Sequence, residues 1–166
     1  IPENIEKIFY GINSDIGSSE IRFPNLNGFL HKINDPNLDG YLLISRYNGE
    51  LKKSIVEIYD FKKRKVIHKY SPDFNEIIQN SPKTKNLSNI NNNFNAERYI
   101  IRHPLLLKDG SLIFNSSESS LVRVDKCSSI IWISDYLFHH SKEIDNKNYI
   151  YVPLTDNNDI LSLNNM

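Results

Sequence analysis

Short hydrophobic segments, each about the length of a strand, follow one another along the chain and are separated by polar turns. Several of them alternate apolar and polar side chains, which is typical of strands with one buried face. No segment continues a helical apolar stripe beyond about two turns, and only residues 74–79 fit a short helix. The predicted strands lie at 41–45, 54–59, 65–70, 111–114, 121–124, 130–133 and 148–152. The pattern therefore predicts an all-β fold.

Residues 81–95 differ in texture, because lysine, serine and asparagine dominate and residues 91–93 are all asparagine. Such a segment can bury almost no apolar surface. The strand pattern resumes unchanged after it. We therefore expect residues 71–98 to be mostly an inserted, partly mobile connection inside one domain that spans residues 1–166.

The strand pattern repeats along the chain. Residues 103–114 align without a gap with residues 140–151, an offset of 37 residues. Asp60 and Asp125 each end a strand before a polar turn, and we expect their carboxylates to hold these hairpin turns. In this alignment Lys147 stands where the first copy has the turn glycine, Gly110.

Short strands in repeats of roughly 40 residues are typical of β-propeller blades. We predict blades at about 25–70, 101–133 and 138–166, with boundaries near residues 101 and 138. A closed propeller has about four to eight blades, so these three would form part of a larger one. Tyr70 and Trp132 fall on outer strands, where we expect them to pack against the following blade.

Composition removes several classes of function. Lysine and arginine number 20, as do aspartate and glutamate, so the net charge is zero, which argues against a nucleic-acid binder. The mean hydropathy is −0.46, and no apolar run approaches the roughly 18 residues that span a membrane. A single cysteine, Cys127, excludes an internal disulfide and a cysteine-cluster metal site. The chain begins at Ile1 without a signal segment, which we interpret as a processed or partial chain.

Histidines recur at one position of the repeat. His31, His103 and the His139–His140 pair each precede a turn of the Asp-Gly type. Innermost strands begin there and line the channel of a propeller, so the imidazoles would converge on one cavity. Imidazole can serve as a nucleophile, a general acid or base, or a metal ligand. A metal site is the weaker interpretation, because no carboxylate lies at a typical metal-ligand spacing from these histidines. Adjacent strand residues also face opposite ways, so only one of His139 and His140 can face the channel. The gapless alignment favours His140 over His139, and ordinary structural roles for these histidines stay open.

Arg46 is a further candidate, because it ends the apolar segment 40–46 rather than opening a polar loop. The planar fork of an arginine can hold a sulfate, phosphate or carboxylate in a two-point contact. The alternative is a solvated arginine at the rim of the fold.

Three stretches together resemble one family: residues 102–114, which contain His-Pro-Leu-Leu before Asp-Gly, residues 121–126 leading to Trp132, and residues 138–141 with His-His-Ser running on to 153. They resemble blades of the arylsulfotransferase (aryl sulfate sulfotransferase) family, and residues 40–70 also resemble one of its blades. The resemblance covers about residues 25–155. Lys147 departs from the family pattern at the turn glycine.

The resemblance implies a six-bladed propeller, periplasmic or secreted, that moves a sulfuryl group from an aryl sulfate to a phenol without a nucleotide sulfate donor or any cofactor. A channel histidine would carry the group as a transient sulfohistidine. By position, His140 and His103 would be catalytic, while His139, Arg46 and His31 would bind the substrate, with no metal. The implied partners are the small aryl sulfate and the phenol, with no nucleic acid and no membrane span, and a homo-oligomer is compatible with this picture. The alternative is a non-catalytic propeller that acts as a binding scaffold.

Overall fold

The computed structural model describes four stretches of the chain: residues 37–82, 95–117, 119–139 and 141–154. The chain divides into two units, residues 1–37 and residues 38–166. The described stretches belong almost entirely to the second unit. The start of the first predicted blade and residues 83–94 of the predicted insertion lie outside the described residues.

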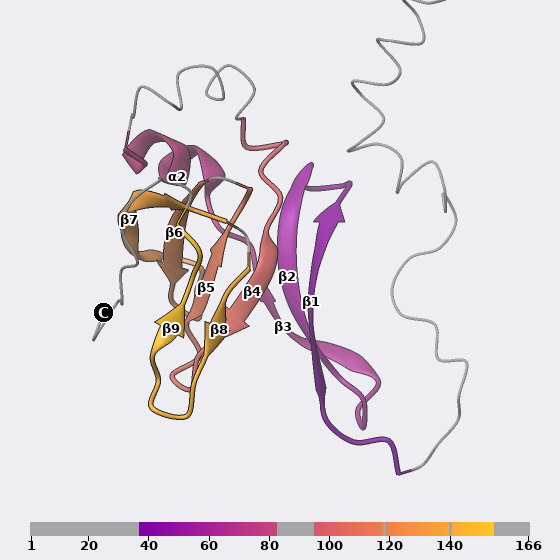
Figure 1. The fold of residues 1–166 in the computed structure, drawn as a ribbon. Coiled ribbons are helices and arrows are strands. Elements are labelled where there is room, and N and C mark those ends of the chain that lie inside the picture. Colours follow the sequence, from indigo (N-terminus) through magenta and orange to yellow (C-terminus); the bar gives the residue numbers. More distant parts are fainter. Residues whose placement is uncertain (1–36, 83–94, 118, 140, 155–166) are drawn as a thin grey trace, which may run out of the picture. The chain divides into compact units, whose positions relative to one another are not determined.

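The first sheet has three antiparallel strands in the order β1-β2-β3 (Figure 1). These strands are β1 (Tyr41–Asn48), β2 (Lys53–Asp60) and β3 (Lys65–Tyr70). The central strand is buried on both faces, as the complete burial of Ile55 and Val56 shows. Strong β-formers occupy it, and the polar turns on either side end it.

The second sheet is a four-stranded antiparallel meander in the order β4-β5-β6-β7. Its strands are β4 (Arg102–Leu106), β5 (Leu112–Asn115), β6 (Ser119–Val124) and β7 (Ile130–Phe138). A two-stranded hairpin follows, made of β8 (Glu143–Ile144) and β9 (Ile150–Tyr151). The second sheet spans residues 102–138, which include most of the range 101–133 for which the sequence predicted a blade.

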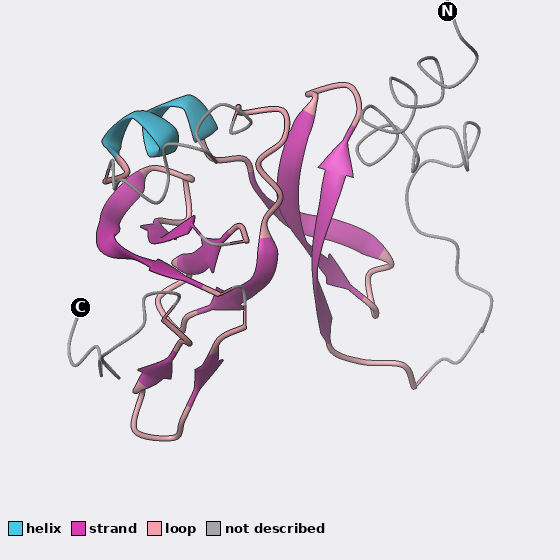
Figure 2. Ribbon diagram, turned by 45° about the horizontal axis from the view of Figure 1, so that its top comes forward, coloured by secondary structure: helices cyan, strands magenta, loops and turns pink. Residues whose placement is uncertain are grey.

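Strands dominate the described residues, with one short helix beside them (Figure 2). That helix is α2 (Phe74–Asn80), close to the predicted 74–79. Asp73 caps it, because its carboxylate accepts hydrogen bonds from the backbone N–H of Asn75 and of Glu76. The all-β prediction is confirmed, whereas the described sheets do not close into a ring.

Aspartates hold the hairpin turns as predicted. The Asp60 carboxylate accepts the backbone N–H of Lys63 at 2.8 Å, which is the main cause of the lowered pKa of Asp60. The Asp125 carboxylate accepts the backbone N–H groups of Cys127 and Ser129 at 2.8 and 2.9 Å. These bonds fix the turns before β3 and β7.

The β8–β9 hairpin corrects the register of the repeat. Leu105 pairs with Ile113, and Glu143 pairs with Tyr151, so equivalent residues are 38 apart rather than 37. The left-handed turn position agrees, because Gly110 has φ 80° and Asn148 has φ 67°. Asn148, and not Lys147, therefore takes the place of the turn glycine, which suits an asparagine because it tolerates positive φ. At this offset the gapless match between His103 and His140 no longer holds.

Two apolar clusters join the sheets. In the first, Tyr70 and Val56 of the first sheet pack with residues of the second, and Phe74 of α2 stacks on Tyr99 with ring centroids 4.5 Å apart. The Tyr70 hydroxyl donates to the carbonyl oxygen of Gly110 at 2.8 Å. Tyr70 therefore packs against the next sheet, as predicted.

The second cluster joins β4–β7 to the β8–β9 hairpin. Its buried residues are Ile113, Leu121 and Phe138, and Trp132 and Ile150 pack against them. Trp132 thus packs on the cluster that joins its own sheet to the following hairpin. Phe138 also forms an isolated antiparallel bridge with Leu154.

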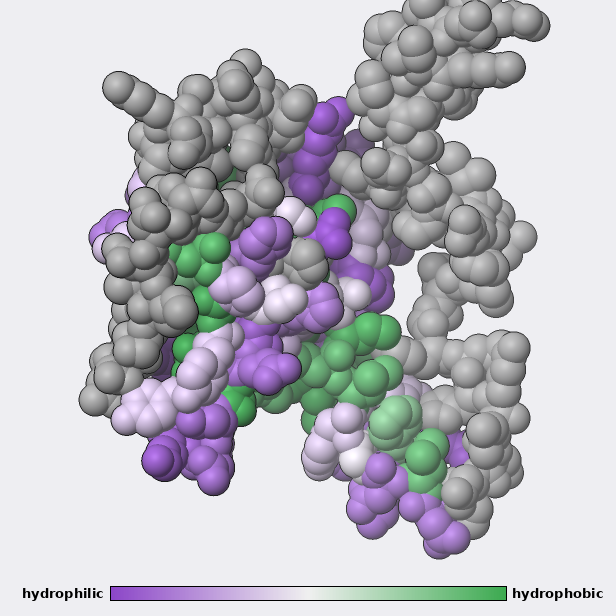
Figure 3. Space-filling view, in the orientation of Figure 1, coloured by the Kyte–Doolittle hydropathy of each residue, from purple (hydrophilic) through white to green (hydrophobic). Residues whose placement is uncertain are grey.

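Hydrophobic side chains also reach the surface, as the green areas between polar residues show (Figure 3). On the edge strands β1 and β3 the exposed ones are Tyr41, Leu42, Val66 and Ile67. Side chains of a strand point to the two faces of its sheet, so their exposure shows that no described residue covers these positions. The described residues therefore leave apolar surface of the first sheet uncovered.

Candidate functional site

His103 lies on β4, the first strand of the second sheet, and its side chain is exposed. Its backbone has φ 43°, a left-handed conformation that few non-glycine residues adopt. The β4–β5 register shifts between Arg102 and Leu105, so His103 sits in an irregular part of the ladder. β4 also contacts β1, the first strand of the first sheet.

A buried asparagine ties the end of β7 to the start of β4. Asn115 faces Arg102 across the β4–β5 ladder and is fully buried. Its Nδ2 donates to the carbonyl oxygens of Phe138 and His139, both at 3.0 Å. The structure thereby brings the backbone of His139 close to the strand that carries His103. The Oδ1 of Asn115 is buried and has no hydrogen-bond partner among the described residues.

A lysine makes a second tie to β4. Lys142 Nζ donates to the carbonyl oxygens of Arg102 and of His103, both at 3.0 Å. Burial lowers the pKa of Lys142 to about 8. The side chain of His139 is exposed, and its backbone N–H donates to the Pro153 carbonyl at 2.9 Å. Lys142 thus holds the segment after β7 directly to the start of β4, while Asn115 joins the end of β7 to β5.

Arg46 forms an ion pair within its own sheet. Its Nε and Nη2 donate to the two carboxylate oxygens of Glu57 at 2.8 and 3.0 Å. The fork expected to hold a sulfate is therefore occupied by a carboxylate of the neighbouring strand. The preceding residue, Ser45, donates to the Ile101 carbonyl. Because alternate strand residues face opposite ways, Arg46 points away from the sheet that carries His103.

Two of the predicted site residues, His31 and His140, lie outside the described residues. Of the others, the structure brings the His139 backbone close to β4 and His103, and it separates Arg46 from them. Sequence reasoning missed Asn115 and Lys142. The one signal in the sequence was that Lys142 follows the histidine pair closely, because the role of Asn115 depends on strand pairing.

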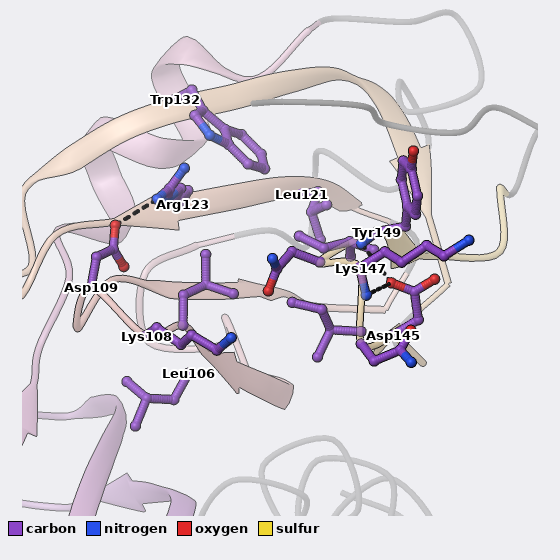
Figure 4. Close-up of a pocket in the computed structure, with 14 residues that line it drawn as sticks. Leu106, Lys108, Asp109, Leu121, Arg123, Trp132, Asp145, Lys147 and Tyr149 are labelled. Carbon is purple, nitrogen blue, oxygen red and sulfur yellow. Dashed lines mark hydrogen bonds and ion pairs between the residues drawn. The ribbon is translucent and has the colours of Figure 1, made fainter.

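A cavity of about 650 Å³ lies between the β4–β5 turn and the β8–β9 hairpin (Figure 4). Of the candidate histidines that the structure describes, neither His103 nor His139 lines it. Arg123 Nη2 binds the Asp109 carboxylate at 2.7 Å, and its Nε donates to the Ser111 hydroxyl at 2.9 Å. Hydrogen bonds from Ser111, and then Arg123, lower the pKa of Asp109. These charged groups of the cavity therefore satisfy one another.

Comparisons with protein-family models, with curated proteins and with solved structures found no match. In the part of the chain that the structure describes, no helix is long and apolar enough to cross a membrane. The same residues contain no group of three or more His, Cys, Asp or Glu side chains that could hold a metal ion. His103 and His139 are the candidate histidines that the structure describes, and both are exposed.

Proposed function

We propose that the three sheets are successive blades of one β-propeller that transfers a sulfuryl group from an aryl sulfate to a phenol through a channel histidine. A succession of antiparallel sheets supports the propeller, with β1 and β4, the first strands of two consecutive sheets, in contact. In a propeller the first strands are the innermost ones, so His103 on β4 would face the channel.

One observation carries the proposal. His103 is exposed at the start of the first strand, and the segment that follows β7 is tied to that point through Asn115 and Lys142. The His139–His140 pair belongs to this segment. These hydrogen bonds therefore favour one shared site for His103 and the His139–His140 pair, which are far apart in the sequence.

The chemistry needs two transfers of the sulfuryl group. A lone pair of a neutral imidazole attacks the sulfur, and the sulfur–oxygen bond to the first ring breaks. That oxygen leaves with the electron pair and takes a proton from solvent. The acceptor phenol then attacks the sulfur of the sulfohistidine, the nitrogen–sulfur bond breaks, and the acceptor's proton passes to solvent. The atoms and charge balance without a metal or a nucleotide.

Negative charge on the sulfate oxygens requires cationic or hydrogen-bonding partners in the transition state. Arg46 is engaged by Glu57, so it does not supply this charge in the proposed site. Arg102 is exposed and precedes His103 where the irregular β4–β5 register interrupts the alternation of side chains, so we assign it to the sulfate instead. A second imidazole in protonated form would add to it.

The test is turnover of a nitrophenyl sulfate with a phenol acceptor in the full-length protein. His140→Ala should abolish turnover. His103→Ala should slow it by roughly 10²–10³, the effect of losing an oxyanion donor. His68→Gln, a histidine on β3, serves as the matched control and should retain the parent rate once circular dichroism shows that it folds. Unchanged rates in both alanine variants would refute the proposal.

A binding scaffold is the second candidate, and the closed Arg46–Glu57 pair favours it, because that pair leaves one expected sulfate contact unavailable. A parent protein that binds aryl sulfates without turning them over would support the scaffold. Fold alone does not separate the two functions.

A further inference from the structure

The ammonium group of Lys142 holds two consecutive backbone carbonyls of β4. Nζ lies 3.0 Å from the carbonyl oxygen of Arg102 and 3.0 Å from that of His103. Lys142 stands just before β8, two residues after His140. One side chain of the segment with the histidine pair therefore fixes the backbone at the other candidate histidine.

The backbone at His103 needs such support. Its φ of 43° is unusual for a residue with a side chain, and the ladder to β5 shifts register beside it. A β-bulge redirects the side chain of the bulged residue, so small changes in this backbone swing the imidazole. Hydrogen bonds from a charged donor are roughly twice as strong as neutral ones, which suits an ammonium to this task.

We infer that Lys142 is a positioning residue that sets the direction of the His103 imidazole by holding the backbone of Arg102 and His103. The effect of Lys142 on the rate rests on the proposed sulfuryl transfer. Its hydrogen bonds to the Arg102 and His103 carbonyls, which we call the Lys142 clamp, do not. Lys142 is partly buried, and the carbonyl oxygens replace the water that its ammonium loses. Asn115 supports the same junction from inside the sheet by holding the Phe138 and His139 carbonyls.

The experiment compares Lys142→Met, which keeps the length and loses the donors, with Lys142→Arg, which keeps charge and donors. Lys147→Met is the control, because Lys147 is an exposed lysine of the same hairpin. In the full-length protein, Lys142→Met should lower kcat about 10- to 100-fold, the cost of a misplaced reactive group, with KM little changed. Lys142→Arg should recover much of kcat, and Lys147→Met should match the parent.

A second readout does not depend on turnover. Modification of His103 by diethyl pyrocarbonate, followed by peptide mass spectrometry, should change in rate in Lys142→Met and keep the parent's rate in Lys147→Met. If the parent has no sulfuryl-transfer activity, the proposed function fails. The rate of His103 modification alone then tests whether Lys142 positions His103. An unchanged His103 rate, or a Lys142→Met variant with the parent's kcat, would overturn the inference. A rise in KM with unchanged kcat would also overturn it, because it would place Lys142 on the substrate.

Discussion

Replacing Arg46 by methionine should destabilise the fold and leave substrate affinity unchanged, because the guanidinium is committed to Glu57. Both carboxylate oxygens of Glu57 receive N–H groups of Arg46, at 2.8 and 3.0 Å. Methionine keeps the aliphatic part of the side chain and removes every donor. The Glu57 carboxylate, in the centre of a buried strand, then loses its partner.

The size of the effect follows from burial. The Glu57 side chain is 8% exposed and that of Arg46 is 42% exposed. Breaking a fully buried pair costs about 3–5 kcal/mol, whereas an exposed pair contributes up to about 1 kcal/mol. The half-exposed arginine places this pair between the two limits. We expect a loss of about 2 kcal/mol in the free energy of unfolding.

A double-mutant cycle of Arg46→Met and Glu57→Gln, followed by urea unfolding, measures the interaction. Glu57→Gln alone should cost less than Arg46→Met, because a neutral amide is cheaper to bury than an unpaired carboxylate. The fluorescence of Trp132, the single tryptophan of the sequence, reports the transition. An unchanged urea midpoint in Arg46→Met together with a raised KM for an aryl sulfate would refute this reasoning. It would indicate that Arg46 binds the substrate.

Three further changes test other parts of the fold. Asn115→Leu should cost about 2–4 kcal/mol in urea unfolding, because the buried carbonyl of Phe138 loses its donor, at about 1–3 kcal/mol, and the part-buried carbonyl of His139 loses a hydrogen bond of about 1 kcal/mol. Tyr70→Phe should cost about 0.5–1.5 kcal/mol in the same assay, through loss of the hydrogen bond to Gly110 between the sheets. Burial raises the pKa of Tyr99 to about 12. Since an unfolded tyrosine ionises near pH ~10, the contribution of Tyr99 to the free energy of unfolding should be constant below that pH and fall from there toward pH 12. Tyr99→Phe should make the loss of stability over this pH range smaller.

The strands and the helix were predictable because their signals are local. Alternation of apolar residues located β2 and β6, and an aspartate before a polar turn indicated the hairpins at Asp60 and Asp125. β4 was not among the predicted strands, because Pro104 and the irregular ladder beside His103 interrupt its alternation.

The site was less predictable, because it depends on which residues face each other across strands. Nothing near Arg46 in the sequence marks Glu57 as its partner. In the β1–β2 register Arg46 lies opposite Ile55, and its side chain reaches diagonally to Glu57, two residues further along β2. The contacts of Lys142 likewise span about forty residues of chain. The one-residue error in the repeat came from aligning a lysine with a glycine, when the backbone places Asn148 at that position.

The central claim is that one of the histidines of the shared site, His140 or His103, carries the sulfuryl group. Its most direct test is mass spectrometry of the full-length protein, quenched rapidly after mixing with a nitrophenyl sulfate and no acceptor. The account predicts a gain of one sulfuryl group, released nitrophenol in equal amount, and an adduct that peptide mapping assigns to His140 or His103. Addition of a phenol should remove the adduct. Nitrophenol release without any adduct, or an adduct on another residue, would contradict the account.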